Sequence, residues 1–470
     1  MKPLIFLLTL IVCVTSQNLN AKVKLPSIIS NHMVLQRESK VKLWGWSNKK
    51  GNVEITTSWN SSKCNARISS DGKWETVIET GTAGGPYTIT LYDGDATVLE
   101  DIYLGEVWLC SGQSNMEMPI RGFMGQPVEK STETVAAANP ETPIRLFKID
   151  RTPSKTPMEN CPGSWKFNTP ESVSEFSAVA YFFGIQLYKT LNIPVGLVCS
   201  SCGGSAIQLW MTRDILKQYP EISQEHLDDN SNVKSPHSVA SMLYNGMINP
   251  IKNYKFKGVI WYQGESNRNN PTQYESLFQT FVNDWRTQLN DKNLPFYYVQ
   301  IAPYCYDNKD AVGTALLRQA QYNCEDKIPN VGMVVTMDIG NETCIHPEKK
   351  MEVGNRLAYM ALNKTYGIEG ISCMSPRYHS HEVKDNKIII SFERAPLGIT
   401  SFYKPLLNFE IAGDDNVYYP AQAVIVNRNK VQIWHDGVKV PKKIRYAYKN
   451  FANGDLFGVN GMPVSSFIVE

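Results

Sequence analysis

The middle of the sequence, residues 104–370, alternates short apolar runs with segments of helical periodicity, and this alternation restricts the fold more than any other feature. The short runs are typical of buried strands. They lie at residues 107–110, 144–149, 195–200, 258–262, 296–301 and 331–337. Helical spacing occurs at residues 176–191, 272–289 and 350–362. Alternating strands and helices predict a parallel sheet that is covered on both faces.

The regions on either side of this segment have a β-like pattern. Residues 22–103 contain runs of period two separated by turn residues, which predicts a small β-sandwich. Residues 371–470 hold further β-like runs, and they form either a separate module or a layer beside the first β region. A chain of 470 residues is long enough for two or three domains.

The first residues have the features of an export signal. A positively charged start leads into an apolar run at residues 4–14, which is too short to span a bilayer. We expect residues 1–21 to be removed, with cleavage after Ser16 or Ala21, and the mature protein to be periplasmic or secreted. We find no other segment that is long and apolar enough to cross a membrane.

Charge and cysteine content exclude several classes of function. A formal net charge of +2 does not indicate a nucleic-acid partner. The 10 cysteines are scattered through a long chain, which is unlike a disulfide framework. Cys199 and Cys202 form a C-x-x-C pair, but no second pair or paired histidines complete a zinc site. We therefore expect no bound metal, and we expect Cys199 and Cys202 to be ordinary thiols at a strand end.

Four polar segments follow predicted strands. Because ligands bind at the carboxyl edge of an open α/β sheet, a serine in the turn after the first strand, Ser114, is a candidate nucleophile. Such a serine needs a base and donors for the oxyanion. The paired glycines in residues 200–206 offer backbone N–H groups, and residues 261–267 crowd polar side chains at another strand end. His346, which Pro347 fixes at a helix start, is the candidate base.

Three of these segments resemble motifs of the sialate O-acetylesterase family, within the SGNH-hydrolase superfamily. They are Gly-Gln-Ser-Asn-Met at residues 112–116, Trp-Tyr-Gln-Gly-Glu-Ser-Asn at 261–267 and Ile-His-Pro at 345–347; residues 245–248 and 456–467 are similar to that family as well. The resemblance covers nearly the whole mature chain. It implies a flavodoxin-like three-layer α/β domain over residues 104–370 that hydrolyses O-acetyl esters without a metal or another cofactor.

The resemblance also implies roles for individual residues. Ser114 is expected to be the nucleophile, and His346 its general base and then the acid for the leaving sugar hydroxyl. The oxyanion is expected to be met by the backbone N–H of Ser114, a backbone N–H at Gly203 or Gly204, and the side-chain amide of Gln263. Residues that are expected to hold the loop or to contact substrate are Glu265, Asn267 and, for the carboxylate of a sialic acid, Arg268.

The sequence departs from the family pattern beside the histidine. A carboxylate that orients the imidazole is expected two or three residues before His346, where this chain has Cys344 and Thr343. We expect a Ser–His dyad in which a backbone carbonyl orients the ring. The alternatives are that Glu342 or Asp338 reaches the ring, or that the enzyme is weak or inactive.

Two other functions are compatible with the sequence. The same chemistry suits acetylated xylan or another acetylated glycan instead of an acetylated sialic acid. A non-catalytic glycan-binding protein on a hydrolase scaffold is the third hypothesis, because the orienting carboxylate is missing and both flanks are rich in β-structure.

Overall fold

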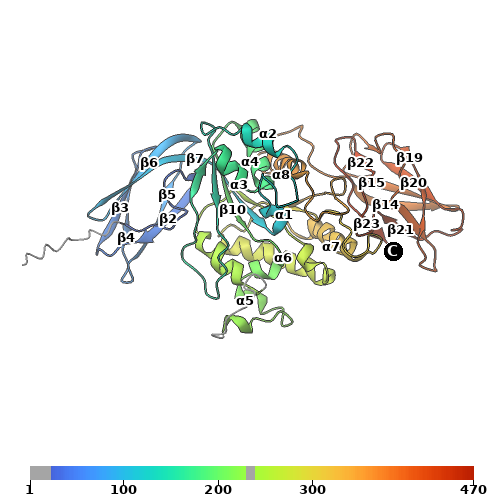
Figure 1. Ribbon diagram of the computed structural model, residues 1–470, viewed down its shortest axis with the longest axis horizontal. Helices are drawn as coiled ribbons and strands as arrows, with labels where there is room; N and C mark the ends of the chain where they lie inside the picture. Colours follow the sequence, from blue (N-terminus) through green and yellow to red (C-terminus); the bar gives the residue numbers. More distant parts are fainter. Residues whose placement is uncertain (1–22, 229–238) are drawn as a thin grey trace, which may run out of the picture.

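A computed structural model of the protein describes residues 23–228 and 239–470. The predicted signal peptide at residues 1–21 lies outside these ranges. The described chain has a central sheet with helices on both sides, a β-rich region at its N-terminal end and another at its C-terminal end (Figure 1). Among the described residues, all cysteines are free thiols and no helix has the length and hydropathy to span a bilayer.

The central sheet runs in the order β13-β12-β11-β7-β10-β8-β9. Its strands are parallel except β9, which is antiparallel to β8. Every residue of β10 through β13 is buried, as expected for strands that are covered on both faces. The bounds are β7 (Ala96–Gly112), β8 (Ile144–Lys148), β9 (Trp165–Phe167), β10 (Val195–Ser201), β11 (Gly258–Tyr262), β12 (Phe296–Val299) and β13 (Val331–Val334).

Helices cover the two faces of this sheet separately. Helices α4 (Ala178–Leu191) and α8 (Lys350–Lys364) pack together on one face, and α6 (Pro271–Gln288) and α7 (Gly313–Lys327) on the other (Figure 1). The helices expected at residues 176–191, 272–289 and 350–362 are therefore confirmed. Shorter helices are α1 (Ser114–Glu117), α2 (Ser131–Ala136), α3 (Pro170–Glu175) and α5 (Arg213–Leu216).

Strand β7 belongs to two sheets in turn. Its first part pairs with β6 and β1 of the N-terminal region, and from Glu106 onward it pairs with β10, joined by β11 from Trp108. The change of partners lies next to the expected domain boundary between residues 103 and 104. The N-terminal strands are β1 (Val34–Gln36), β2 (Lys40–Trp46), β3 (Asn52–Thr57), β4 (Lys63–Arg67), β5 (Lys73–Glu79) and β6 (Gly84–Tyr92), with β2 and β5 forming a separate pair.

The C-terminal region contains two four-stranded antiparallel sheets and a two-stranded one. The expected strands at residues 387–392, 423–426 and 431–434 are found in β15, β19 and β20. The bounds are β14 (Arg377–Lys384), β15 (Lys387–Glu393), β16 (Ile399–Thr400), β17 (Phe409–Ala412), β18 (Tyr419–Pro420), β19 (Gln422–Asn427), β20 (Lys430–Trp434), β21 (Lys443–Tyr446), β22 (Phe457–Gly458) and β23 (Phe467–Val469).

Candidate active site

The ends of β7, β10 and β11 are tied together by backbone bonds. Gly112 has φ +145°, and a Cβ there would lie 2.1 Å from the carbonyl oxygen of Tyr262, so no side chain fits. The N–H of Gln113 donates to that carbonyl at 3.0 Å, and the N–H of Cys202 donates to the carbonyl of Gly112 at 3.0 Å. These bonds bring the three polar turns together at the carboxyl edge of the sheet, next to α1.

Ser114 and His346 meet at this edge. Ser114 is the first residue of α1, two residues past the end of β7, and its Oγ lies 2.7 Å from Nε2 of His346. The imidazole is half-buried, and burial followed by the charge of Lys350 lowers the pKa of His346 to about 4. The ring is therefore neutral at pH 7 and can accept a proton.

The other ring nitrogen has an unexpected partner. Nδ1 of His346 lies 2.7 Å from Oε1 of Gln126, a side-chain amide, so the expected backbone carbonyl is a wrong prediction. Glu342 is exposed, and Asp338 forms a two-pronged ion pair with Arg356, so neither expected alternative acid is the partner of the ring. Nothing in the sequence near His346 points to a residue 220 positions away.

Thr343 and Cys344, at the positions of the missing acid, have a local role. Their N–H groups both donate to Oδ1 of Asn341 at 3.0 Å, and the Cys344 thiol donates to the carbonyl of His346 at 3.2 Å. These bonds shape the loop that presents the imidazole.

The donors available for an oxyanion differ from the expected set. The N–H of Gly203 donates to Oε2 of Glu117 at 2.9 Å. Gly204 is therefore the remaining one of the two glycines that were candidates for the backbone oxyanion donor. Gly204 has φ +75° in a tight turn and faces open space. Gln263 is fully buried, and its amide nitrogen donates to the carbonyl of Ser205 at 3.2 Å and to Oδ1 of Asn267 at 2.8 Å. Both N–H groups of Gln263 are thus used within the protein in this structure, so its role as an oxyanion donor stays a prediction.

The expected substrate contacts are mostly internal. Glu265 is 4% exposed, and its Oε1 accepts a bond from Nδ2 of Asn115 at 2.7 Å. Asn267 is 7% exposed, and its Oδ1 accepts a bond from the N–H of Ile207 at 2.9 Å. Both residues connect loops through these bonds, and their role toward a substrate stays a prediction. Arg268 is half-buried, with its guanidinium 4.8 Å from the ring centre of Tyr306.

A buried polar network lies beneath the Ser–His pair. Asn115 follows the serine, and its Nδ2 also donates to the carbonyl of Ile345 at 3.1 Å, beside the histidine. Nζ of Lys350 donates to Oδ1 of Asn115 at 2.6 Å. Burial lowers the pKa of Lys350 to about 7 and raises the pKa of Glu265. Sequence reasoning missed Lys350, because a lysine near a helix start ordinarily indicates a solvated face.

Arg151 is a second residue that the sequence did not reveal. Its guanidinium forms a two-pronged pair with the carboxylate of Glu117, with Nε 2.7 Å from Oε1. The side chain is 48% exposed, and a Cβ on Gly203 would lie 3.4 Å from it and 3.5 Å from Cβ of Ser114. A partly exposed cation therefore lies beside the turn that flanks the serine, on a loop after β8 that has no recognisable motif.

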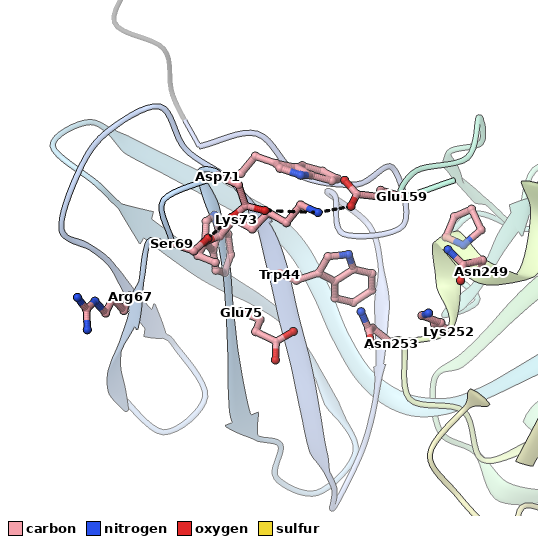
Figure 2. Close-up of a pocket in the computed structure, with 14 residues that line it drawn as sticks. Trp44, Arg67, Ser69, Asp71, Lys73, Glu75, Glu159, Asn249, Lys252 and Asn253 are labelled. Carbon is pink, nitrogen blue, oxygen red and sulfur yellow. Dashed lines mark hydrogen bonds and ion pairs between the residues drawn. The ribbon is translucent and has the colours of Figure 1, made fainter. Parts of the chain in front are cut away.

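A cavity of about 510 Å³ lies elsewhere, between the β2–β5 pair and a loop of the central region (Figure 2). Trp44 and Asn253 line it, and Lys73 contacts Asp71 and Glu159 at its rim. It contains none of the residues of the Ser–His site.

Comparison with known proteins places this chain in a family. The sequence model described as "Carbohydrate esterase, sialic acid-specific acetylesterase" matches residues 104–363, more than half of the chain. Sialate O-acetylesterase of Mus musculus is 29% identical over 433 residues, covering 80% of this chain and 79% of the mouse protein. The Homo sapiens protein of the same name is 30% identical over 400 residues, covering 78% of this chain and 75% of the human one.

A solved structure supports the same family assignment. The crystal structure of a carbohydrate acetylesterase from Xanthomonas citri superposes with a TM-score of 0.86 at 32% identity, covering 96% of this chain and 100% of that one. The match extends over the β-rich ends as well as the central sheet. The chain is a carbohydrate O-acetylesterase and belongs to the sialic acid-specific acetylesterase family.

Proposed function

We propose that the protein removes O-acetyl groups from sialic acids through a serine acyl-enzyme, and the observation that carries this proposal is the 2.7 Å contact between Ser114 Oγ and His346 Nε2. The serine attacks the acetyl carbonyl while His346 takes its proton. The N–H groups of Ser114 and Gly204 stabilise the oxyanion. His346 then protonates the departing sugar oxygen, and water releases acetate by the reverse sequence.

The sheet supports an SGNH-type, flavodoxin-like assignment of the central domain. Its strands β10-β7-β11-β12-β13 follow the order 2-1-3-4-5 when they are numbered along the chain from β7 without β8 and β9. In such sheets the ligand lies outside the carboxyl ends of the strands at the switch point, which here is the end of β7.

The charges near the serine suit an anionic sugar. Arg151 lies on the Gly203 side of Ser114, and Arg268 lies past Glu265 on the β11 side. A sialic acid carries a carboxylate, and a guanidinium binds a carboxylate through two parallel hydrogen bonds. Arg151 already pairs with Glu117, so a substrate carboxylate would share or displace that partner. We also propose export from the cell, on the strength of the signal-like residues 1–21.

The test is acetate release from O-acetylated sialic acid by wild-type protein and by Ser114→Ala, with acetylated xylan as the second substrate. We expect release from the sialate that the substitution abolishes. Release from xylan alone would mean that the proposed mechanism holds but that the substrate is an acetylated glycan other than a sialic acid. If well-folded wild-type protein releases acetate from neither, and a serine-reactive phosphonate fails to label Ser114, the proposal is wrong and the glycan-binding hypothesis takes its place.

A further inference from the structure

A tight turn at residues 123–126 encloses one side of the catalytic imidazole. The N–H of Phe123 donates to the carbonyl of Gln126, and the N–H of Gln126 donates back to the carbonyl of Phe123, both at 3.0 Å. Gly125, in the middle of the turn, has φ +71°, which favours glycine. Met124 at the tip is 99% exposed, so the turn presents its two end residues inward and its tip to solvent.

Both end residues of the turn contact His346. Oε1 of Gln126 lies 2.7 Å from Nδ1, and the ring of Phe123 packs edge-on, with ring centres 5.3 Å apart and planes at 74°. The connection after the turn is fixed to the histidine loop, because the N–H of Glu129 donates to the carbonyl of Glu348 at 2.9 Å. The position of the imidazole therefore depends on this turn as well as on its own loop.

The hydrogen bond to Gln126 determines where the imidazole proton lies. An amide oxygen can only accept a hydrogen bond, so Nδ1 of His346 must carry the proton and donate it. Nε2 then has its lone pair directed at the hydroxyl of Ser114, 2.7 Å away. This is the tautomer that a general base for the serine requires, and in a carboxylate triad it is the acid that selects it.

We propose that Gln126 is the positioning residue that replaces the triad carboxylate, with its side-chain amide oxygen holding the Nδ1–H of His346. This inference rests on the proposed roles of Ser114 and His346. An amide oxygen selects the same tautomer and ring orientation as a carboxylate does. It has no full negative charge, so it stabilises the imidazolium that forms during the reaction less strongly.

Because the charged groups around His346 are known, an electrostatic effect of residue 126 on the ring can be told apart from an effect on packing. Lys350 on α8 acts on the pKa of His346 through its charge, and it is linked through Asn115 to Glu265. The carboxylate of Glu348, on the same loop, accepts a bond from Nδ2 of Asn341 at 3.4 Å, and the carboxylate of Glu117 on α1 is paired with Arg151. In the described part of the chain, the only side chain bonded to Nδ1 is the neutral one of Gln126.

The experiment introduces the missing charge at the same position. In Gln126→Glu a carboxylate oxygen takes the place of the amide oxygen, and an opposite charge this close raises a histidine pKa by about 1–3 units. We expect the titration of His346, followed by NMR of its ring, and the acid limb of kcat/KM for 4-nitrophenyl acetate both to move up by that amount. The rate on the plateau should equal or exceed that of the wild type.

Gln126→Ala and Met124→Ala complete the series. Gln126→Ala removes the acceptor, so we expect kcat to fall at least about tenfold with KM nearly unchanged. Met124→Ala changes the exposed tip of the same turn and should leave the rate and the pH profile as they are. Recovery of the rate in Gln126→Glu but not in Gln126→Ala would be the signature of positioning through the hydrogen bond.

Two results would overturn the inference. One is an unmoved His346 titration in Gln126→Glu, which would show that residue 126 does not act on Nδ1 in solution. The other is an equal loss of kcat in Gln126→Glu and Gln126→Ala, which would mean that the residue only maintains the turn. The NMR titration needs no turnover, so an inactive wild-type protein would refute the proposed function and still leave this test readable.

Discussion

At the scale of single residues, the site is arranged to keep its base neutral. Burial, and then the neighbouring charge of Lys350, lowers the pKa of His346 to about 4, because both disfavour the imidazolium. His346 must be neutral to take the proton of Ser114. Activity should therefore be present above about pH 4 and be lost as the pH falls through that value.

Replacement of Lys350 by methionine tests the second of these causes. The substitution removes the cation whose charge disfavours the imidazolium, so the pKa of His346 should rise from about 4 toward its ordinary value of 6.5. The acid limb of kcat/KM for a neutral ester should move upward in the same way.

Lys349→Met is the matched control, because Lys349 is half-buried one position earlier in the chain and its charge is not among the causes of the His346 shift. We expect its pH profile to match that of the wild type. An acid limb that stays near pH 4 in Lys350→Met would mean that burial alone sets the pKa of the histidine.

At the scale of elements, the pattern of apolar residues was sufficient to predict the helices and strands that pack through apolar side chains. It failed to predict a helix that packs through polar ones. The strands of the central sheet are continuous apolar runs, and the inward face of α6 follows a regular helical spacing, so both were predictable. Helix α7 was missed because buried polar residues, Arg318 and Gln321 among them, interrupt its apolar stripe.

The residues of the candidate site also divide into those that a local motif indicates and those that it does not. Ser114 lies just past the end of β7 and His346 in the loop before α8, each within a short motif, and the sequence indicated both. Gln126, Lys350 and Arg151 act through tertiary contacts with residues far away in the chain or through burial, neither of which a local pattern reveals. Gln263 was assigned by its position in a motif, but the direction of its amide depends on Asn267 of the same motif and on Ser205, which is 58 positions away and meets it only in the fold.

Helix α6 offers a test of the packing between helix and sheet. Trp285 is fully buried, packs at a 75° angle against Trp261 with ring centres 5.7 Å apart, and donates its Nε1–H to the carbonyl of Trp210 at 2.7 Å. Trp285→Ala leaves a large cavity and an unpaired carbonyl, so we expect a loss of about 3–5 kcal/mol in the free energy of unfolding.

Asn283 on the exposed side of the same helix supplies the control. The free energy of unfolding of both variants is measured by urea titration, and Asn283→Ala should change it by less than about 0.5 kcal/mol. A loss of under about 1 kcal/mol for Trp285→Ala would show that this face of α6 is not packed as described.

At the scale of the whole molecule, the β-rich ends are continuous with the domain that carries the site. Strand β7 passes from the N-terminal sheet into the central one and ends two residues before Ser114. At the other end, Oδ1 of Asn450 accepts bonds from the N–H and Oγ1 of Thr314 on α7 at 3.0 and 2.9 Å. The three regions should therefore lose their structure together and not as independent modules.

Arg318 is the residue whose replacement tests this coupling. It is fully buried in α7, and its guanidinium donates to Oγ of Ser466 at 3.0 Å and to the carbonyl of Lys449, both in the C-terminal region. Burial lowers its pKa to about 10, so it is still charged at pH 7. Arg318→Met would leave several buried acceptors unpaired, and we expect a loss of about 3 kcal/mol or more.

Arg318→Lys should not restore this stability, because a single ammonium group cannot reach the separate acceptors that the guanidinium spans. Lys442→Met is the control: its side chain is 51% exposed and pairs with Asp414 at the surface, so its removal should change the unfolding midpoint in urea very little. If the regions are coupled, Arg318→Met shifts one shared transition, followed by tryptophan fluorescence and by loss of esterase activity. A separate fluorescence phase at lower urea that is carried by Trp434 of the C-terminal region, with activity lost at the wild-type urea concentration, would mean that this region unfolds independently of the site.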